Sequence, residues 1–80
     1  MEKSFSYEIK RHIATISETP KLSVELNLIS YAGRPPQFDL RKWRIVEEGK
    51  MMNKGLTLSS AELLSLRDAL NKMAEADFCK

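Results

Sequence analysis

The side chains that usually carry out catalysis are sparse in this 80-residue chain. His12 is the only histidine, Cys79 is the only cysteine, and no serine lies in a G-x-S-x-G motif. Nucleophilic catalysis needs a nucleophile beside a base, and a zinc site needs several His or Cys ligands. Glu47 and Glu48 are adjacent in a predicted turn, where their side chains diverge and form a poor acid/base pair. We therefore expect no enzymatic activity, no metal and no cofactor.

Cationic and aromatic side chains offer a different chemistry. Residues 1–58 contain ten Lys/Arg and seven Asp/Glu, whereas residues 59–80 contain three and four, so the basic excess lies in the first part of the chain. Lys and Arg bind phosphates, while Tyr and Trp stack on unpaired bases for about 1–3 kcal/mol per base. The same residues are also compatible with aromatic rings that cover an interface and cations that only solvate the surface.

Alternating apolar and polar residues predict that these side chains lie on strands. Residues 4–17 form a first predicted strand, and residues 18–20, which include a proline, end it. Residues 21–31 form a second, half-buried strand. Its two predicted faces carry Leu22, Val24, Leu26 and Leu28 on one side, and Ser23, Glu25, Asn27 and Tyr31 on the other.

Two further strands and one helix complete the predicted α+β domain. After a turn at residues 32–36, Phe38 and Leu40 face the predicted core, so that Asp39, Arg41 and Trp43 face the opposite surface. Residues 50–58 form the fourth predicted strand, with Gly55 as a candidate bulge.

The predicted helix begins at a capping box formed by Ser59 and Glu62. Its apolar stripe contains Leu63, Leu66, Leu70 and Met73. This stripe is broader than one small sheet requires, so we expect it to contact both its own sheet and a partner chain.

Chain length also favours self-association. A chain of this size buries only about 60% of its unfolded surface, and here neither an internal disulfide nor a Cys/His zinc site can add stability. A homodimer is therefore expected. The lone thiol and the absence of an apolar run in residues 1–10 predict a cytoplasmic protein, and no segment is apolar enough to predict a membrane span.

Residues 26–43 (LNLISYAGRPPQFDLRKW) and residues 54–59 (KGLTLS) resemble a bacterial branch of the positive cofactor 4 family. The resemblance covers roughly residues 21–75 of a single domain. It implies a curved four-stranded antiparallel sheet, a C-terminal helix and a helix-swapped homodimer. It also implies binding of single-stranded DNA with little sequence preference, in transcriptional coactivation or other DNA transactions.

The resemblance also implies roles for individual residues. Arg41 matches the DNA-contacting arginine of the family, and Tyr31 matches its stacking aromatic residue. Trp43 and Arg44 occupy the positions where eukaryotic members have a tyrosine and a tryptophan. The full set of predicted ligand contacts, drawn from the resemblance and from the polar strand faces, is Lys10, Lys21, Asn27, Tyr31, Arg34, Arg41, Trp43, Arg44, Lys50 and Lys54, with His12 as an extension.

Two alternatives remain open at the level of sequence. RNA is a possible ligand in place of DNA, because no residue is seen to recognise a 2′-hydroxyl group. A protein-interaction module, whose aromatic and basic face binds an acidic partner such as a polymerase subunit, would need no nucleic acid.

Overall fold

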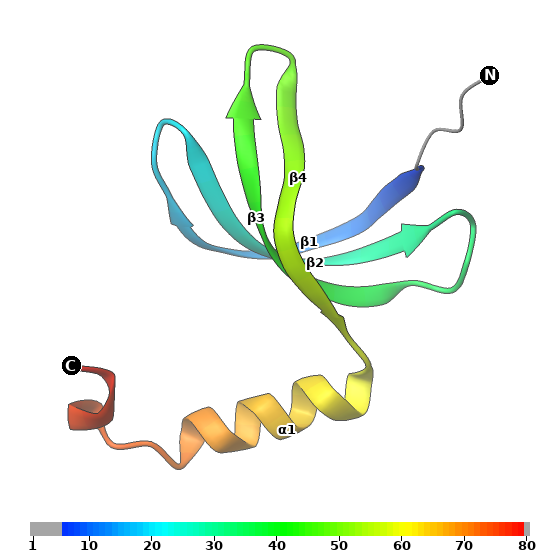
Figure 1. Ribbon diagram of the computed structural model, residues 1–80. Coiled ribbons are helices and arrows are strands. Elements are labelled where there is room, and N and C mark those ends of the chain that lie inside the picture. The colour runs from blue at the N-terminus through cyan, green and yellow to red at the C-terminus, as the bar shows by residue number, and fades with distance from the viewer. Residues whose placement is uncertain (1–5, 80) are drawn as a thin grey trace.

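The computed structural model describes residues 6–79 and contains one antiparallel sheet followed by a helix (Figure 1). The elements are β1 (Tyr7–Glu18), β2 (Leu22–Tyr31), β3 (Gln37–Val46), β4 (Gly49–Leu58), α1 (Ser60–Asn71) and a 3-10 helix, η1 (Glu75–Phe78). The strands pair in chain order. This confirms the predicted ββββα order; residues 4 and 5 of the first predicted strand lie outside the described residues.

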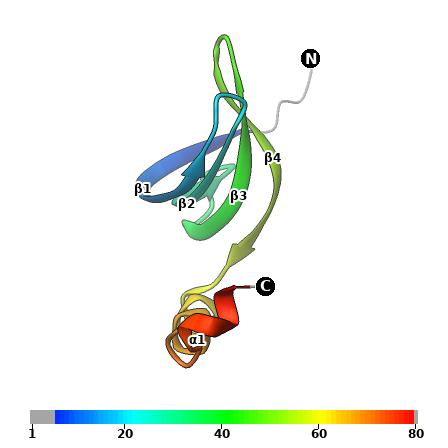
Figure 2. The ribbon, with the colours of Figure 1, turned by 90° about the vertical axis from the view of Figure 1, so that its left-hand side faces the viewer.

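The sheet is strongly curved, and α1 lies beside it as an arm that begins where β4 ends (Figures 1 and 2). Register shifts interrupt the β1–β2 pairing at three places and the β3–β4 pairing between Arg41 and Trp43. Each such irregularity bends and twists the strand that carries it. No helix in the described part of the chain is long and apolar enough to cross a membrane.

Strand register gives the sheet two faces. Cross-strand partners share a face, and the pairs Glu25–Arg41 and Asn27–Asp39 therefore place these four residues on one side, which we call the polar face. Leu26 pairs with Leu40 on the other side, which we call the helix face because α1 lies beside it. The alternation predicted for residues 21–31 is thus confirmed.

The buried apolar side chains lie on the polar face, contrary to the predicted position of the core. Ile29 and Trp43 are 0% and 2% exposed, whereas Phe38 and Leu40 are only half-buried. Trp43 does share a face with Arg41, as predicted, but the expectation that it lies away from the core is wrong. The curved sheet and Tyr7 cover it; the two rings have centroids 5.8 Å apart and an interplanar angle of 54°.

The start of α1 agrees with the sequence pattern. The Ser59 hydroxyl accepts a hydrogen bond from the Glu62 amide, and the Glu62 carboxylate accepts one from the Ser59 amide, which confirms the capping box. The helix ends at Asn71, so Met73 lies beyond it and the helical stripe is shorter than predicted. A cavity of about 440 Å³ separates the stripe from the sheet. Its apolar lining is Ile16, Val24, Leu26, Leu40, Leu63, Leu66 and Leu70.

A strained turn joins β2 to β3. Ala32 and Gly33 have φ angles of 51° and 76°, and the Arg34 amide donates to the Tyr31 carbonyl across 2.9 Å. Two central residues with positive φ form a type I′ turn, which suits the twist of a hairpin but disfavours a residue with a Cβ atom. Ala32 is therefore held in a conformation that glycine adopts at lower cost.

Replacing Ala32 by glycine is expected to raise the free energy of unfolding by up to about 1 kcal/mol, because relief of left-handed strain exceeds the added entropy of the unfolded chain. Urea denaturation monitored by Trp43 fluorescence measures the change. The matched variant Gly33→Ala should instead be destabilised. A less stable Ala32→Gly protein would contradict the strain at this turn.

Candidate nucleic-acid interface

The buried carboxylate of Asp39 holds two predicted ligand contacts together on the polar face. Asp39 is 0% exposed and accepts hydrogen bonds from Arg41 Nε (2.7 Å), from Arg41 Nη2 (2.6 Å) and from the Tyr31 hydroxyl. Arg41 Nη2 also donates to the Tyr31 oxygen (3.1 Å), and Nη1 donates to the Asn53 carbonyl (2.9 Å). These contacts join β2, β3 and β4 through side chains.

Gly55 makes room for the Arg41 side chain. The two residues are direct partners between β3 and β4, and a Cβ atom at position 55 would lie 2.0 Å from Arg41 Cβ. No real pair of Cβ atoms lies so close, so any larger residue would displace one of the two strands. The predicted bulge lies next to Gly55. After the Arg41–Gly55 pair the next pair is Trp43–Met52, so two residues of β4, Asn53 and Lys54, oppose the single residue Lys42 of β3.

Charge within this cluster is already balanced. Burial and the hydrogen bond to Asp39 raise the pKa of Tyr31 to about 12, so its hydroxyl remains a neutral donor at physiological pH. The hydrogen bond to Asp39 is also the main reason that the pKa of Arg41 is raised. The Arg41 side chain is 14% exposed and uses most of its N–H groups inside the protein. Direct contact between Arg41 and a phosphate therefore stays a prediction, whereas its contact with Tyr31 is observed.

A second buried carboxylate, Glu25, balances Lys50 on the same face. Glu25 Oε2 accepts from Lys50 Nζ (2.5 Å) and from the Ser23 hydroxyl (2.7 Å), and Oε1 accepts from Asn27 Nδ2 (3.3 Å). Burial by itself would raise the pKa of Glu25, but these hydrogen bonds outweigh it and lower the pKa. Because the pKa of Glu25 is lower in the folded than in the unfolded chain, the ionised carboxylate stabilises the fold at pH values above the usual Glu titration range. This stabilisation is lost as the pH falls through the pKa of Glu25 in the folded protein.

His12 extends this polar network to β1. Its Nδ1 lies 2.7 Å from Asn27 Oδ1, and its Nε2 lies 3.1 Å from the Thr15 hydroxyl. His12 is therefore a hydrogen-bonded link between β1 and β2, and its predicted contact with a ligand stays a prediction.

Tyr7 is the residue of this face that the sequence did not single out. It pairs directly with Tyr31 across β1 and β2, it is 37% exposed, and its ring contacts Trp43. The sequence shows Tyr7 in the apolar alternation of the first strand, but it does not show the cross-strand register that sets Tyr7 beside Tyr31. We define the aromatic surface as Tyr7 and Tyr31, because both retain exposed area.

Burial removes two predicted contacts from the surface. Trp43 is 2% exposed and Asn27 is 0% exposed, so neither side chain is accessible to a ligand in this structure. Their predicted roles in stacking and hydrogen bonding to nucleic acid are corrected accordingly. Trp43 packs below Tyr7, and Asn27 holds Glu25 and His12 in place.

The other predicted cations are distributed over several surfaces. Arg34 is exposed in the turn after Tyr31, and Lys21 is exposed just before β2. Lys10 pairs with Glu8 at 3.1 Å on β1. Arg44 is the partner of Leu22 and lies on the helix face, opposite to Trp43. The structure therefore brings Tyr31 and Arg41 into contact and places Lys50 farther along the same face, whereas Arg44 lies on the other face.

No protein-family model matches the chain. A protein of Treponema pallidum (strain Nichols) is 42% identical over 71 residues, which cover 88% of this chain and 81% of that protein. This chain belongs to the same family as that protein. The relative is described as an uncharacterized protein, so the relationship names no ligand. Similarity to the positive cofactor 4 family stays a prediction from the sequence.

Replacing Asp39 by asparagine is expected to lower the pKa of Tyr31 and to reduce the free energy of unfolding by about 2–4 kcal/mol, because a buried ion pair loses one partner. Phenolate absorbance during pH titration in a Tyr7→Phe background reports the pKa of Tyr31. Glu8→Gln, which removes an exposed ion pair, should change stability by less than about 1 kcal/mol. An unchanged Tyr31 titration in Asp39→Asn would contradict the role of the carboxylate.

Proposed function

We propose that this protein binds single-stranded nucleic acid, with the aromatic surface of Tyr7 and Tyr31 stacking on unpaired bases. The observation that carries the proposal is that these two tyrosines are register partners on one face and that the Tyr31 hydroxyl is held by Asp39 and Arg41. A ring that is already held in place loses little conformational entropy when a base stacks on it. Duplexes hide the base faces, so the surface favours unpaired strands.

Arg34, beside this surface, is the cation best placed to add a phosphate contact, and Lys50 lies farther along the polar face. Arg34 follows Tyr31 by three residues, and the turn holds its amide against the Tyr31 carbonyl. The Lys50 side chain is 40% exposed on the same face as Arg41, although Glu25 shares its charge. The sequence resemblance supports DNA as the ligand and a role in transcription or other DNA transactions.

A second part of the proposal is that the protein acts as a homodimer. Among residues 6–79, Ile29 and Trp43 are the apolar side chains that reach full burial, while Leu66 and Leu70 remain 37% and 46% exposed beside the apolar cavity. So small a core rarely stabilises a chain of this length alone. We propose that a second copy covers the stripe of α1, in the helix-swapped arrangement that the resemblance implies.

Fluorescently labelled oligo-dT is expected to bind much more tightly than a duplex of equal length. Tyr31→Ala should weaken oligo-dT binding by about 5- to 150-fold, the equivalent of one lost stacking contact. Phe78→Ala, which removes an exposed ring of η1, is the matched control and should leave binding unchanged. Equal affinity for duplex and single strand would contradict stacking. Absence of any binding to oligo-dT or oligo-U would favour the acidic protein partner instead.

Sedimentation at micromolar concentration is expected to give a mass of about 18 kDa, twice the 9.2 kDa of one chain. Leu66→Glu should shift the protein to monomer, because it places a charge in the apolar cavity beside α1. Ser65→Glu adds the same charge at a helix position outside the cavity lining and should remain dimeric. A wild-type protein of 9 kDa at this concentration would rule out the dimer.

A further inference from the structure

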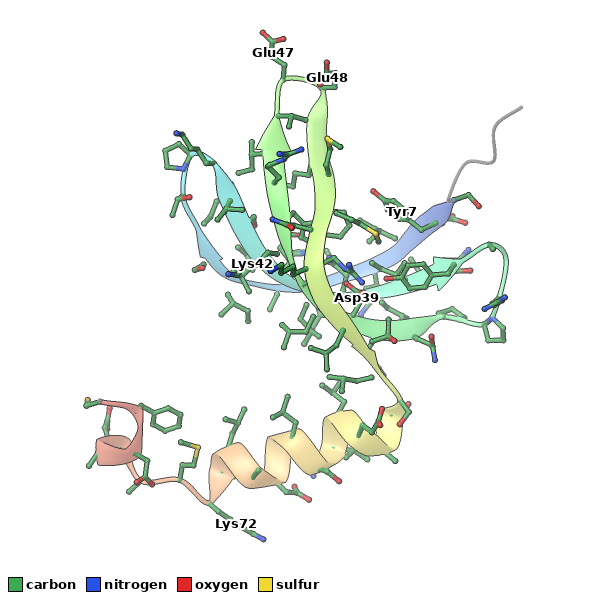
Figure 3. All side chains as sticks on the ribbon, in the orientation of Figure 1. Tyr7, Asp39, Lys42, Glu47, Glu48 and Lys72 are labelled. Atoms are coloured by element: carbon green, nitrogen blue, oxygen red, sulfur yellow. The ribbon has the colours of Figure 1, made fainter. Side chains whose placement is uncertain are left out.

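Three cations form a basic patch on the helix face of β3 and β4, opposite to the aromatic surface. Lys42 and Arg44 are the partners of Val24 and Leu22, which places both on the helix face. Lys54 belongs to the bulge between Met52 and Gly55, and both of these flanking residues pair on the polar face. Figure 3 shows Lys42 and Asp39 on opposite sides of β3. We call Lys42, Arg44 and Lys54 the β3–β4 basic patch; all three are exposed.

Like charges oppose each other in this patch. The bulge sets Lys54 and Asn53 against Lys42, and like charges in opposed positions destabilise an antiparallel pair. By contrast, the carboxylates of Glu8, Glu25 and Asp39 lie within ion-pair distance of Lys10, Lys50 and Arg41, respectively. Within residues 6–79, no carboxylate lies within 4.0 Å of a patch cation.

The neighbours of the patch supply no compensating negative charge. Leu22 and Val24 adjoin it on β2, and Met51 lies 4.0 Å from Arg44 Nη2. The positive charge is thus concentrated over an apolar part of the sheet. Such an arrangement costs stability in the isolated chain and attracts an anionic partner.

We propose that the β3–β4 basic patch binds the phosphate backbone of the single strand whose bases stack on the aromatic surface. This inference rests on the proposed function. The polar face provides rings, but Asp39 and Glu25 already balance Arg41 and Lys50, so beside Arg34 the phosphates of a longer strand need cations from elsewhere. β4 is an edge strand of the sheet, and a polynucleotide that passes over this edge reaches the patch from the polar face. Short strands engage the aromatic surface alone, whereas longer strands engage both.

The test compares Lys42→Gln/Lys54→Gln with a control of equal charge, Arg11→Gln/Lys72→Gln, whose substitutions lie on β1 and at the end of α1. Affinities for oligo-dT of about 6 and about 20 nucleotides are measured between 0.05 and about 0.3 M salt. For the long strand, loss of two phosphate contacts should reduce affinity by roughly 25-fold at 0.1 M salt and make the log–log salt slope shallower by about 1.4. Affinity for the short strand should stay within about twofold, and the control should behave as wild type.

Thermal unfolding provides a readout that does not depend on ligand. Lys42→Gln should raise the Tm by about 1–4 °C at low salt, with no gain at high salt, because it removes the repulsion from Lys54. A lower or unchanged Tm at low salt would contradict the repulsion between Lys42 and Lys54.

The outcomes separate this inference from the proposed function. The patch variant could keep its affinity for the long strand and its salt slope while Tyr31→Ala still binds weakly. That result would reject phosphate binding by the patch and retain the proposed function. Failure of the wild-type protein to bind strands of either length would overturn both. If the patch variant becomes monomeric while its affinity per chain is unchanged, the patch instead pairs with acidic residues of a second copy, and the inference is wrong.

Discussion

The polar face of this sheet is organised around two buried carboxylates, Asp39 and Glu25. Asp39 ties β3 to β2 through Tyr31, and Arg41 carries the connection to β4 through the Asn53 carbonyl. A buried carboxylate is costly unless hydrogen bonds compensate it, so the positions of Arg41 and Tyr31 depend directly on Asp39. Strand pairing alone would leave the rings and cations of this face free to adopt several rotamers.

This arrangement also constrains the backbone. Arg41 lies against β4 at the position of Gly55, where a Cβ atom has no space, and the neighbouring bulge places both Asn53 and Lys54 opposite Lys42. The segment of β4 from Asn53 to Gly55 therefore contacts the Arg41 side chain on one face and carries Lys54 opposite Lys42 on the other.

The distribution of apolar surface complements the distribution of charge. Trp43 and Ile29 are enclosed on the polar face, while the leucines of α1 and the half-buried leucines of β2 and β3 border a cavity on the helix face. A small chain with this division has little interior of its own. Its helix face carries two surfaces of different character, one apolar and one cationic, for which we propose a second copy of the chain and a polynucleotide as the respective partners.

The sequence by itself determined the strand order, the two-faced alternation of residues 21–31 and the capping box at Ser59, because these depend on side-chain period and on local hydrogen bonds. It also placed Tyr31 and Arg41 on one face. Only the tertiary structure decided that Trp43 is buried, that Tyr7 adjoins Tyr31 and that Arg44 lies on the helix face. Burial and pairing depend on sheet curvature and on cross-strand register, which join residues far apart in the chain. Likewise, only the folded neighbourhood shows which cations have a carboxylate partner within the chain.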